Sequence, residues 1–311
     1  MSNPLTIFSL YFSSFFCRHS KKKREIMAEA EVETKKRKKT ETEKKTETET
    51  KKRKKTKETF IYGNYKNYYG YRIDRNQEDD PRLAVFNREW FEGKDCLDVG
   101  CNQGLITISI AKKFHCRSIL GVDIDAGLID AAHWNLRKFA RMMKASKAQV
   151  SDSTDCSANN ICIGSSEKTY NTACSPSEED IFGRVSFMKE NFVASSHGCS
   201  EKYDAILCLS VSKWIHLNWG DDGLITLFVK IWRLLRPGGI FVLEPQPWSS
   251  YNRNRQVSKT ATLNFNNIIL RPHVFREILL DKIGFRSAEI VTDSLSGTVA
   301  GFNRSIIAFT K

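Results

Sequence analysis

The sequence lacks the features that mark membrane-spanning, fibrous and disulfide-stapled proteins. No apolar run reaches the roughly 18 residues that a spanning helix needs, and 7 Pro and 17 Gly among 311 residues exclude a collagen-like repeat. The nine Cys are odd in number and include no Cys-x-x-Cys pair. We therefore expect reduced thiols inside a cell, and neither a disulfide framework nor a zinc or other metal site. A hydrophobic content of 41% also excludes a fully disordered chain.

The first residues form only a poor signal peptide. Leu5–Phe16 is apolar, but no basic residues precede it and the polybasic stretch Lys21–Arg24 follows it. Met27 opens a sequence that resembles an ordinary start, so our hypothesis is that residues 1–26 are an alternative extension. Abundant peptides from residues 1–20 in the native protein would contradict this hypothesis.

Most of the net charge of +13 lies in one repetitive segment. Residues 21–58 hold 17 Lys/Arg and 9 Asp/Glu, and the run Lys-Lys-Arg-Lys-Lys occurs at 35–39 and again at 51–55. No residue there can fill a core, so we expect a disordered basic tail over residues 1–59. The two basic runs predict nuclear import and a nuclear protein. The alternative is a tail that increases solubility and carries no targeting signal.

From Phe60 onward, strand-like and helix-like segments alternate, which predicts a mostly parallel α/β sheet in one domain over residues 60–311. Residues 142–182 have little periodicity and are expected to form a mobile insertion. The last two strands have only a loop between them and should add an antiparallel edge. The predicted strands are Lys94–Val99, Ser118–Ile124, Val185–Phe192, Tyr203–Ser210, Ile240–Glu244, Ala288–Asp293 and Ser305–Thr310. The predicted helices are Leu105–Phe114, Ala126–Arg141, Asp222–Leu235 and Pro272–Ile283.

A glycine-rich turn follows the first predicted strand. It runs from Gly100 to Gly104, and such a turn lets a ligand approach the backbone closely. Asp123, at the end of the second strand, can accept hydrogen bonds from both hydroxyls of a ribose. The dinucleotide fingerprint would need Gly at Asn102 and Leu105, so NAD and FAD are disfavoured. With Arg236–Gly239 before the fifth strand, the pattern resembles the class I S-adenosylmethionine-dependent methyltransferases. That resemblance implies a Rossmann-like, mostly parallel seven-stranded sheet with an antiparallel edge strand, and S-adenosyl-L-methionine as cofactor.

Three further segments combine aromatic and basic residues. They cover residues 62–72 with 80–83, residues 207–221, and residues 243–251. Aromatic rings stack on bases and cations hold phosphates, so the mixture suits RNA. The second and third segments follow strands, at the sheet edge where α/β proteins bind ligands.

These segments resemble the Bicoid-interacting protein 3 family of RNA methyltransferases over about residues 60–311. The form Glu-Pro-Gln-Pro-Trp-Ser-Ser-Tyr at 244–251 is closer to the members that cap 7SK small nuclear RNA than to the shorter members that act on monophosphates. The resemblance implies methylation of a 5′-terminal phosphate oxygen of a small RNA. We expect RNA as the partner, with ribonucleoprotein proteins as further candidates, no membrane association and a monomer.

The resemblance also implies roles for individual residues. Phe192 stands where the family often has Tyr, so a hydroxyl contact is lost while ring stacking remains available. The Tyr68–Tyr69 doublet leaves open which ring is in the site. Cofactor contacts fall on Tyr69, Arg82, Gly100, Cys101, Asn102, Asp123, Ile124, Asn191, Phe192 and Leu209. The phosphate clamp falls on Tyr68, Arg72 and Lys213, and the terminal nucleotide on Glu244 and Gln246.

No catalytic histidine is needed, because a terminal phosphate is already anionic at neutral pH. His216 is therefore interpreted as a packing or loop residue rather than a phosphate donor. Asp125 and Asp221 are interpreted as turn or cap residues, and Trp214 and Trp219 as packing. Two other functions stay open: an RNA-binding scaffold of a ribonucleoprotein that retains the methyltransferase fold, and a methyltransferase for protein or small molecules.

Overall fold

The computed structural model describes residues 60–66, 68, 80–151, 181–195, 201–292 and 304–311, with only the backbone for 143–151. The predictions for the tail 1–59, and for most of the insertion 142–182, lie outside these residues. Within the insertion, the helix α3 continues as far as Ser151, and the short helix α4 begins at Ile181.

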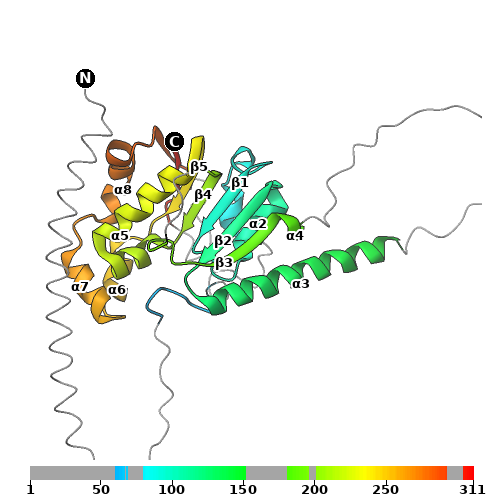
Figure 1. Ribbon diagram of the computed structural model, residues 1–311, viewed down its shortest axis with the longest axis horizontal. Coiled ribbons are helices and arrows are strands. Elements are labelled where there is room, and N and C mark those ends of the chain that lie inside the picture. The colour runs from blue at the N-terminus through cyan, green and yellow to red at the C-terminus, as the bar shows by residue number, and fades with distance from the viewer. Residues whose placement is uncertain (1–59, 67, 69–79, 152–180, 196–200, 293–303) are drawn as a thin grey trace, which may run out of the picture. The chain divides into compact units, whose positions relative to one another are not determined.

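A seven-stranded sheet forms the centre of the fold, as predicted (Figure 1). Its order is β3-β2-β1-β4-β5-β7-β6; the first five strands are parallel, and β7 is antiparallel to both of its neighbours. The antiparallel strand thus lies between β5 and the outermost strand, β6. The strands are β1 (Asp95–Val99), β2 (Ser118–Asp123), β3 (Val185–Lys189), β4 (Tyr203–Leu209), β5 (Leu235–Glu244), β6 (Ser287–Ile290) and β7 (Ile307–Thr310).

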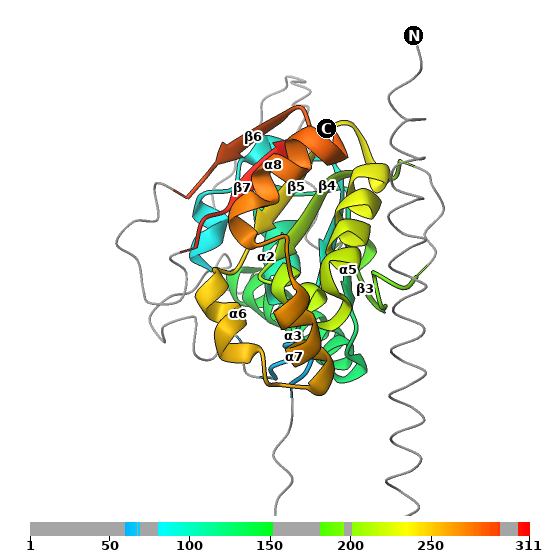
Figure 2. The same ribbon diagram turned by 90° about the vertical axis from the view of Figure 1, so that its left-hand side faces the viewer.

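Helices cover both faces of the sheet because its central strands are apolar on both sides. Successive residues of β1, such as Cys96 and Leu97, belong to two different core clusters, one against α2 and α3 and the other against α5. Figures 1 and 2 show these layers. The helices are α2 (Leu105–Phe114), α3 (Ala126–Ser151), α4 (Ile181–Arg184), α5 (Ser212–Leu234), α6 (Trp248–Asn254), α7 (Lys259–Asn267) and α8 (Phe275–Glu277). Three short 3-10 helices are η2 (Pro81–Ala84), η3 (Arg88–Trp90) and η5 (Pro272–Val274), and η6 (Ile278–Ile283) is a π-helix.

The predicted helix over Asp222–Leu235 begins ten residues earlier in the structure, at Ser212. Two helical pieces meet at Gly220, which has a φ of +66°. Glycine adopts such a positive φ with little strain. The first piece carries Lys213, Trp214 and His216, so the second aromatic and basic segment is helical rather than a loop. Helices α6 and α7 were not predicted, and they place residues 248–267 beside the start of α5.

A third, smaller core joins these helices to α5. Trp214 and Leu217 of α5 pack there with Tyr251 of α6 and Ala261 of α7. His216 is fully buried next to this core, with Nε2 2.7 Å from Asp221 Oδ1 and Nδ1 3.3 Å from the Tyr251 hydroxyl. The interpretation of His216 as a packing and loop residue is therefore confirmed.

Candidate active site

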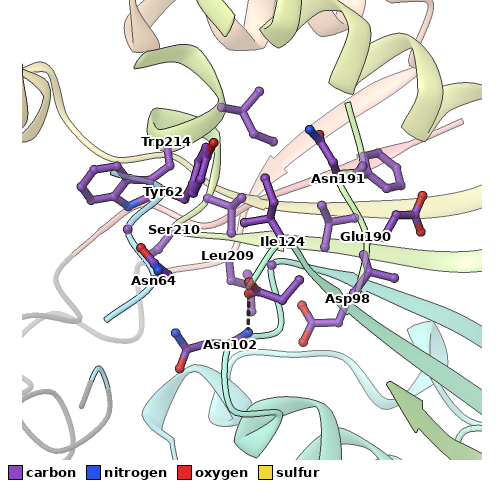
Figure 3. A pocket seen from close by; sticks show the side chains of 18 of the residues that line it. Tyr62, Asn64, Asp98, Asn102, Ile124, Glu190, Asn191, Leu209, Ser210 and Trp214 are labelled. Atoms are coloured by element: carbon purple, nitrogen blue, oxygen red, sulfur yellow. Dashed lines mark hydrogen bonds between the residues drawn. The ribbon is translucent and has the colours of Figure 1, made fainter. Parts of the chain in front are cut away.

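A cavity with roughly 900 Å³ of empty space opens at the carboxyl ends of β1, β2 and β4 (Figure 3). The wall comes from the turn after β1, the ends of β2 and β4, the residues after β3, the start of α5 and residues 62–68. Chain segments far apart in sequence therefore meet at one edge of the sheet.

The turn after β1 requires glycine at its first position. Gly100 has a φ of +79°, and a Cβ atom there would collide with Cγ2 of Val211. Its N–H donates to the carbonyl of Val122 at 2.8 Å, which ties the turn to β2. The backbone of Gly100 therefore forms part of the cavity wall without a side chain to fill the space.

Asp123 ends β2 and is 9% exposed in the cavity wall. Its Oδ2 accepts the N–H of Asn102 at 3.0 Å, the dashed line in Figure 3. Its Oδ1 accepts the N–H of Asp125 at 3.0 Å. Burial raises the pKa of Asp123 from its ordinary value, and these backbone donors oppose the shift. Each oxygen retains acceptor capacity, so the carboxylate can hold a pair of neighbouring hydroxyls.

Asp98 is a second carboxyl group in the wall, and the sequence analysis assigned it no role. It lies in β1, is 1% exposed and accepts the Thr107 hydroxyl at 2.7 Å. Burial raises the pKa of Asp98 to about 6, although Thr107 and Arg82 oppose the shift.

Asp98→Asn is expected to make the unfolding free energy less dependent on pH. In the folded protein Asp98 keeps its proton up to about pH 6, whereas the unfolded chain releases it near pH 4. Stability from this group is thus lost as the pH rises from about 4 to 6, by about 3 kcal/mol at most. Urea unfolding at several pH values would measure it. Parallel pH profiles of the two proteins would contradict the shift.

Arg82 is 1% exposed and links the cavity to a buried ion-pair cluster. Its Nη2 lies 2.7 Å from Asp80 Oδ2, and its Nη1 lies 2.8 Å from Glu244 Oε2. The Ser210 hydroxyl donates to the same Glu244 oxygen at 2.8 Å, and Arg304 donates to the Ser210 hydroxyl at 2.7 Å. The two carboxylates fix the guanidinium at the cavity wall.

Lys213 and Gln246 connect α5 to the segment after β5. The ammonium of Lys213 is 3.0 Å from Ser250 Oγ, 2.8 Å from Asn254 Oδ1 and 4.1 Å from the centre of the Trp214 ring. Gln246 Oε1 accepts the Lys213 N–H at 3.2 Å, and its Nε2 donates to the Ser210 carbonyl. Both side chains are buried, at 5% and 3% exposure, behind the wall that Trp214 forms.

Lys230 of α5 holds the turn that follows β3. The Lys230 ammonium donates to the carbonyls of Phe192 at 2.8 Å and Val193 at 2.9 Å, and also to that of Ser195. Phe192 and Val193 line the cavity, and burial lowers the pKa of Lys230. Lys230 therefore acts as a positioning residue for this part of the wall.

Lys230→Met is expected to weaken binding of S-adenosylhomocysteine by about three- to tenfold, because the turn loses its ammonium donor while the aliphatic stem stays. Isothermal titration calorimetry would measure the loss. Lys138→Met is the matched control, because Lys138 is exposed on α3 and its ammonium lies over the Trp134 ring, away from the turn after β3. Equal affinities of the two variants would contradict a positioning role for Lys230.

Aromatic side chains close the cavity on the side of α5. Tyr62 stacks on Trp219 with ring centres 5.8 Å apart, and Tyr65 packs edge-on against Trp214 at 5.8 Å. Trp214 and Trp219 both line the cavity, so the interpretation of these two as packing alone was incomplete. The signal that could have found them is their position directly after β4.

The structure brings most of the predicted site residues together. The cavity wall includes Tyr68, Arg82, Gly100, Asn102, Asp123, Ile124, Asn191, Phe192 and Leu209. Cys101 is 1% exposed and lies behind the turn; Lys213, Glu244 and Gln246 lie behind the wall as described above. Tyr69 and Arg72 fall outside the described residues. Asp125 caps α3 by accepting the N–H groups of Gly127 and Leu128, as predicted.

In the described part of the chain, no helix has both the length and the apolar character to cross a bilayer. Within the same residues, no cluster of His, Cys, Asp or Glu is arranged to hold a metal ion.

Comparison with known proteins gives two family matches. The family described as Bicoid-interacting protein 3 matches residues 203–311, and a methyltransferase domain family matches residues 97–241. A probable RNA methyltransferase of Arabidopsis thaliana is 58% identical over 261 residues, which cover 82% of each chain. The U6 snRNA methylphosphate capping enzyme of Drosophila melanogaster is 35% identical over 81% of this chain and 75% of its own length.

The 7SK snRNA methylphosphate capping enzyme of Mus musculus is 38% identical over 81% of this chain. The matched region makes up only 41% of that enzyme, so the present chain spans less than half of its length. The Arabidopsis and Drosophila proteins match 82% and 81% of this chain. Together with the family match over β4 to β7, they establish that this chain belongs to the Bicoid-interacting protein 3 family.

Proposed function

We propose that the protein is an S-adenosylmethionine-dependent methyltransferase that methylates an oxygen of the 5′-terminal phosphate of a small RNA. The observation that carries the proposal is the cavity, which joins Asp123 and the Gly100 turn to the Trp214 wall and the ion-paired Arg82. The names of the relatives support it, since they describe RNA methylation and methylphosphate capping of small nuclear RNA.

The wall residues fit the proposed cofactor group by group. Asp123 would accept the ribose hydroxyls, and Ile124, Phe192 and Leu209 offer an apolar surface for the adenine ring. Arg82 would pair with the methionine carboxylate. Asn64 Oδ1 is buried in the wall without a hydrogen-bond partner among the described residues, so it is an acceptor that fits a donor on the ligand.

The proposed reaction requires little proton transfer by side chains of the protein. The cofactor supplies a methyl group that is already electrophilic, and the phosphate oxygen is already anionic at neutral pH. The task of the protein is then to align the two groups and manage charge. Arg72 and Lys213 are the proposed cations for the oxygens that do not attack, with Tyr68 beside them. Tyr69 is a proposed cofactor contact, and Glu244 and Gln246 would support the terminal nucleotide.

Labelled S-adenosylmethionine and RNAs with a 5′-triphosphate, monophosphate or hydroxyl end would test the proposal. We expect label in one or both phosphorylated RNAs and none in the hydroxyl RNA. RNA binding without transfer to any of the three would instead favour the scaffold function. Equal labelling of all three RNAs would mean that the methyl group is transferred to a base or a ribose. We also propose that the protein is nuclear, which the small nuclear RNA substrates named for its relatives support, and that it acts as a monomer.

A further inference from the structure

The antiparallel strand β7 brings one more arginine to the end of the sheet where the cavity opens. The parallel strands finish at this end, whereas β7 starts there because it runs in the opposite direction, with Ile307 opposite Leu243 of β5. Arg304 lies three residues before Ile307 and therefore reaches the end of β5. The sequence analysis gave Arg304 no role.

Arg304 joins the buried ion-pair cluster around Arg82 through Ser210 and Glu244. Its Nη1 donates to the Ser210 hydroxyl at 2.7 Å and lies 3.7 Å from Glu244 Oε1. The other oxygen of Glu244, Oε2, accepts from Arg82 Nη1 and from the Ser210 hydroxyl, both at 2.8 Å. The buried carboxylate of Glu244 is thus shared between two arginines, and one of them, Arg82, lines the cavity.

Ser210 is held in an unusual backbone conformation between these charged groups. It lines the cavity and has a φ of +63°, in the left-handed region that favours glycine. Its N–H donates to the Glu244 carbonyl at 3.0 Å, and its own carbonyl accepts from Gln246 Nε2. Its hydroxyl lies between Glu244 and Arg304. Strained residues of this kind gather at functional sites, so the link from Arg304 to the cavity is a fixed one.

The charges of the cluster explain why a second arginine is needed there. Arg82 pairs with both Asp80 and Glu244, so one cation faces two carboxylates. Asp98 is a further carboxyl group that is close enough to interact with the charge of Arg82. These groups alone would repel another carboxylate from Arg82. Arg304 supplies a second positive charge, which balances the pair of Asp80 and Glu244.

We propose that Arg304 is a positioning residue that enables Arg82 to bind the carboxylate of the cofactor. The inference rests on the proposed function, in which Arg82 pairs with the methionine carboxylate. Arg304 offsets the charge of Glu244, which leaves the charge of Arg82 available to the ligand. It also fixes Glu244 and Ser210, so that the guanidinium of Arg82 keeps its orientation. The site therefore selects an adenosine thioether or sulfonium whose side chain ends in a free carboxylate.

Calorimetry with two ligands tests this role. One ligand is S-adenosylhomocysteine, and the other is its carboxamide, which lacks the negative charge. Arg304→Gln should weaken S-adenosylhomocysteine binding by about tenfold, the scale for losing one charge near a partly buried anion, and change carboxamide binding by less than about twofold. Arg304→Lys should keep most of the affinity, because it keeps the charge. A lower stability alone would not remove the preference for the carboxylate.

A compensating variant tests the charge argument directly. Arg304→Gln with Glu244→Gln removes one charge of each sign from the cluster, so S-adenosylhomocysteine affinity should return to within about threefold of wild type. The double variant decides the question even if Arg304→Gln alone is too unstable to purify. A double variant that binds both ligands equally would contradict the proposal.

Arg236→Gln is the matched control. Arg236 also pairs with two carboxylates, Asp204 at 2.6 Å and Asp95 at 3.0 Å, but these lie near the starts of β4 and β1, at the opposite end of the sheet from the cavity. Its affinities for both ligands should match those of the wild type. Equal losses on the two ligands in Arg304→Gln, or an unchanged affinity for S-adenosylhomocysteine, would overturn the proposal.

The same measurements separate this inference from the proposed function. If the wild type prefers S-adenosylhomocysteine to the carboxamide and Arg304→Gln loses that preference, the inference holds even where no methyl group reaches RNA. If the wild type shows no preference for the carboxylate, Arg82 does not bind it. The inference then fails together with the proposed placement of the cofactor.

Discussion

Lys213→Ala is expected to lower methyl transfer to a 5′-phosphorylated RNA by about 100-fold, the scale for losing one preorganised charge donor near a reacting group. Lys213 opens α5 directly after β4, and its ammonium is fixed by Ser250 and Asn254 beside the cavity wall. Affinity for S-adenosylhomocysteine should stay within a few-fold of wild type. Single-turnover transfer and calorimetry would measure the two quantities.

A matched variant separates phosphate binding from a structural role of the same lysine. Asn254→Ala removes one partner of the ammonium but keeps the charge. If Lys213 only fastens α6 to α5, the activity of each variant should fall in step with the stability it loses, about 1 kcal/mol for each hydrogen bond removed. If Lys213 holds the phosphate, Lys213→Ala should lose far more activity. Lys213→Arg should rescue only in part, because a planar fork differs from a point donor.

Arg72 should behave like Lys213 if it holds the same phosphate. Arg72→Ala is expected to lower transfer by about 100-fold as well. The double variant should be little worse than the poorer single variant, because either loss already misplaces the attacking oxygen. Additive losses would mean that the two cations act at separate places.

Asp123→Ala is the second change with a large expected effect, a ten- to hundredfold loss of S-adenosylhomocysteine affinity. A charge-assisted hydrogen-bond pair to a diol contributes about 1.5–3 kcal/mol, which corresponds to that range. RNA affinity should change much less, because Asp123 lies on the β2 side of the cavity, away from α6.

The neighbouring Asp125 provides the control for Asp123. It caps α3 and accepts Asn64 at 2.5 Å but does not line the cavity. Asp125→Ala should therefore lower the melting temperature and affect cofactor affinity less than Asp123→Ala. Wild-type affinity in Asp123→Ala would place the ribose elsewhere in the cavity.

The order of strands and the cofactor turn were predictable because each rests on a local pattern. Apolar runs of β-strand length alternate with helix-like segments, and Gly100 and Asp123 mark strand ends in the sequence itself. Helix α2 has the predicted bounds of Leu105–Phe114. The cavity formed where these ends meet, as the topology of a parallel sheet requires.

Long-range contacts account for what the sequence did not reveal. Glu244 was assigned to the terminal nucleotide, and nothing in the sequence indicated that it is 1% exposed and pairs with Arg82, 162 residues earlier. Helices α6 and α7 are only 7 and 9 residues long, and both pack against Trp214. Arg271 lies over the Trp248 ring although it follows Trp248 by 23 residues, so no local spacing indicates this contact.

The most direct test of the central claim is the position of the transferred methyl group. The protein would be incubated with S-adenosylmethionine and a 5′-triphosphate RNA, and the RNA digested to release its 5′-terminal nucleotide for mass spectrometry. We predict that the added methyl group stays with the terminal phosphate and is absent from the nucleoside left after phosphatase and pyrophosphatase treatment. A methyl group on the base or the ribose would contradict phosphate methylation.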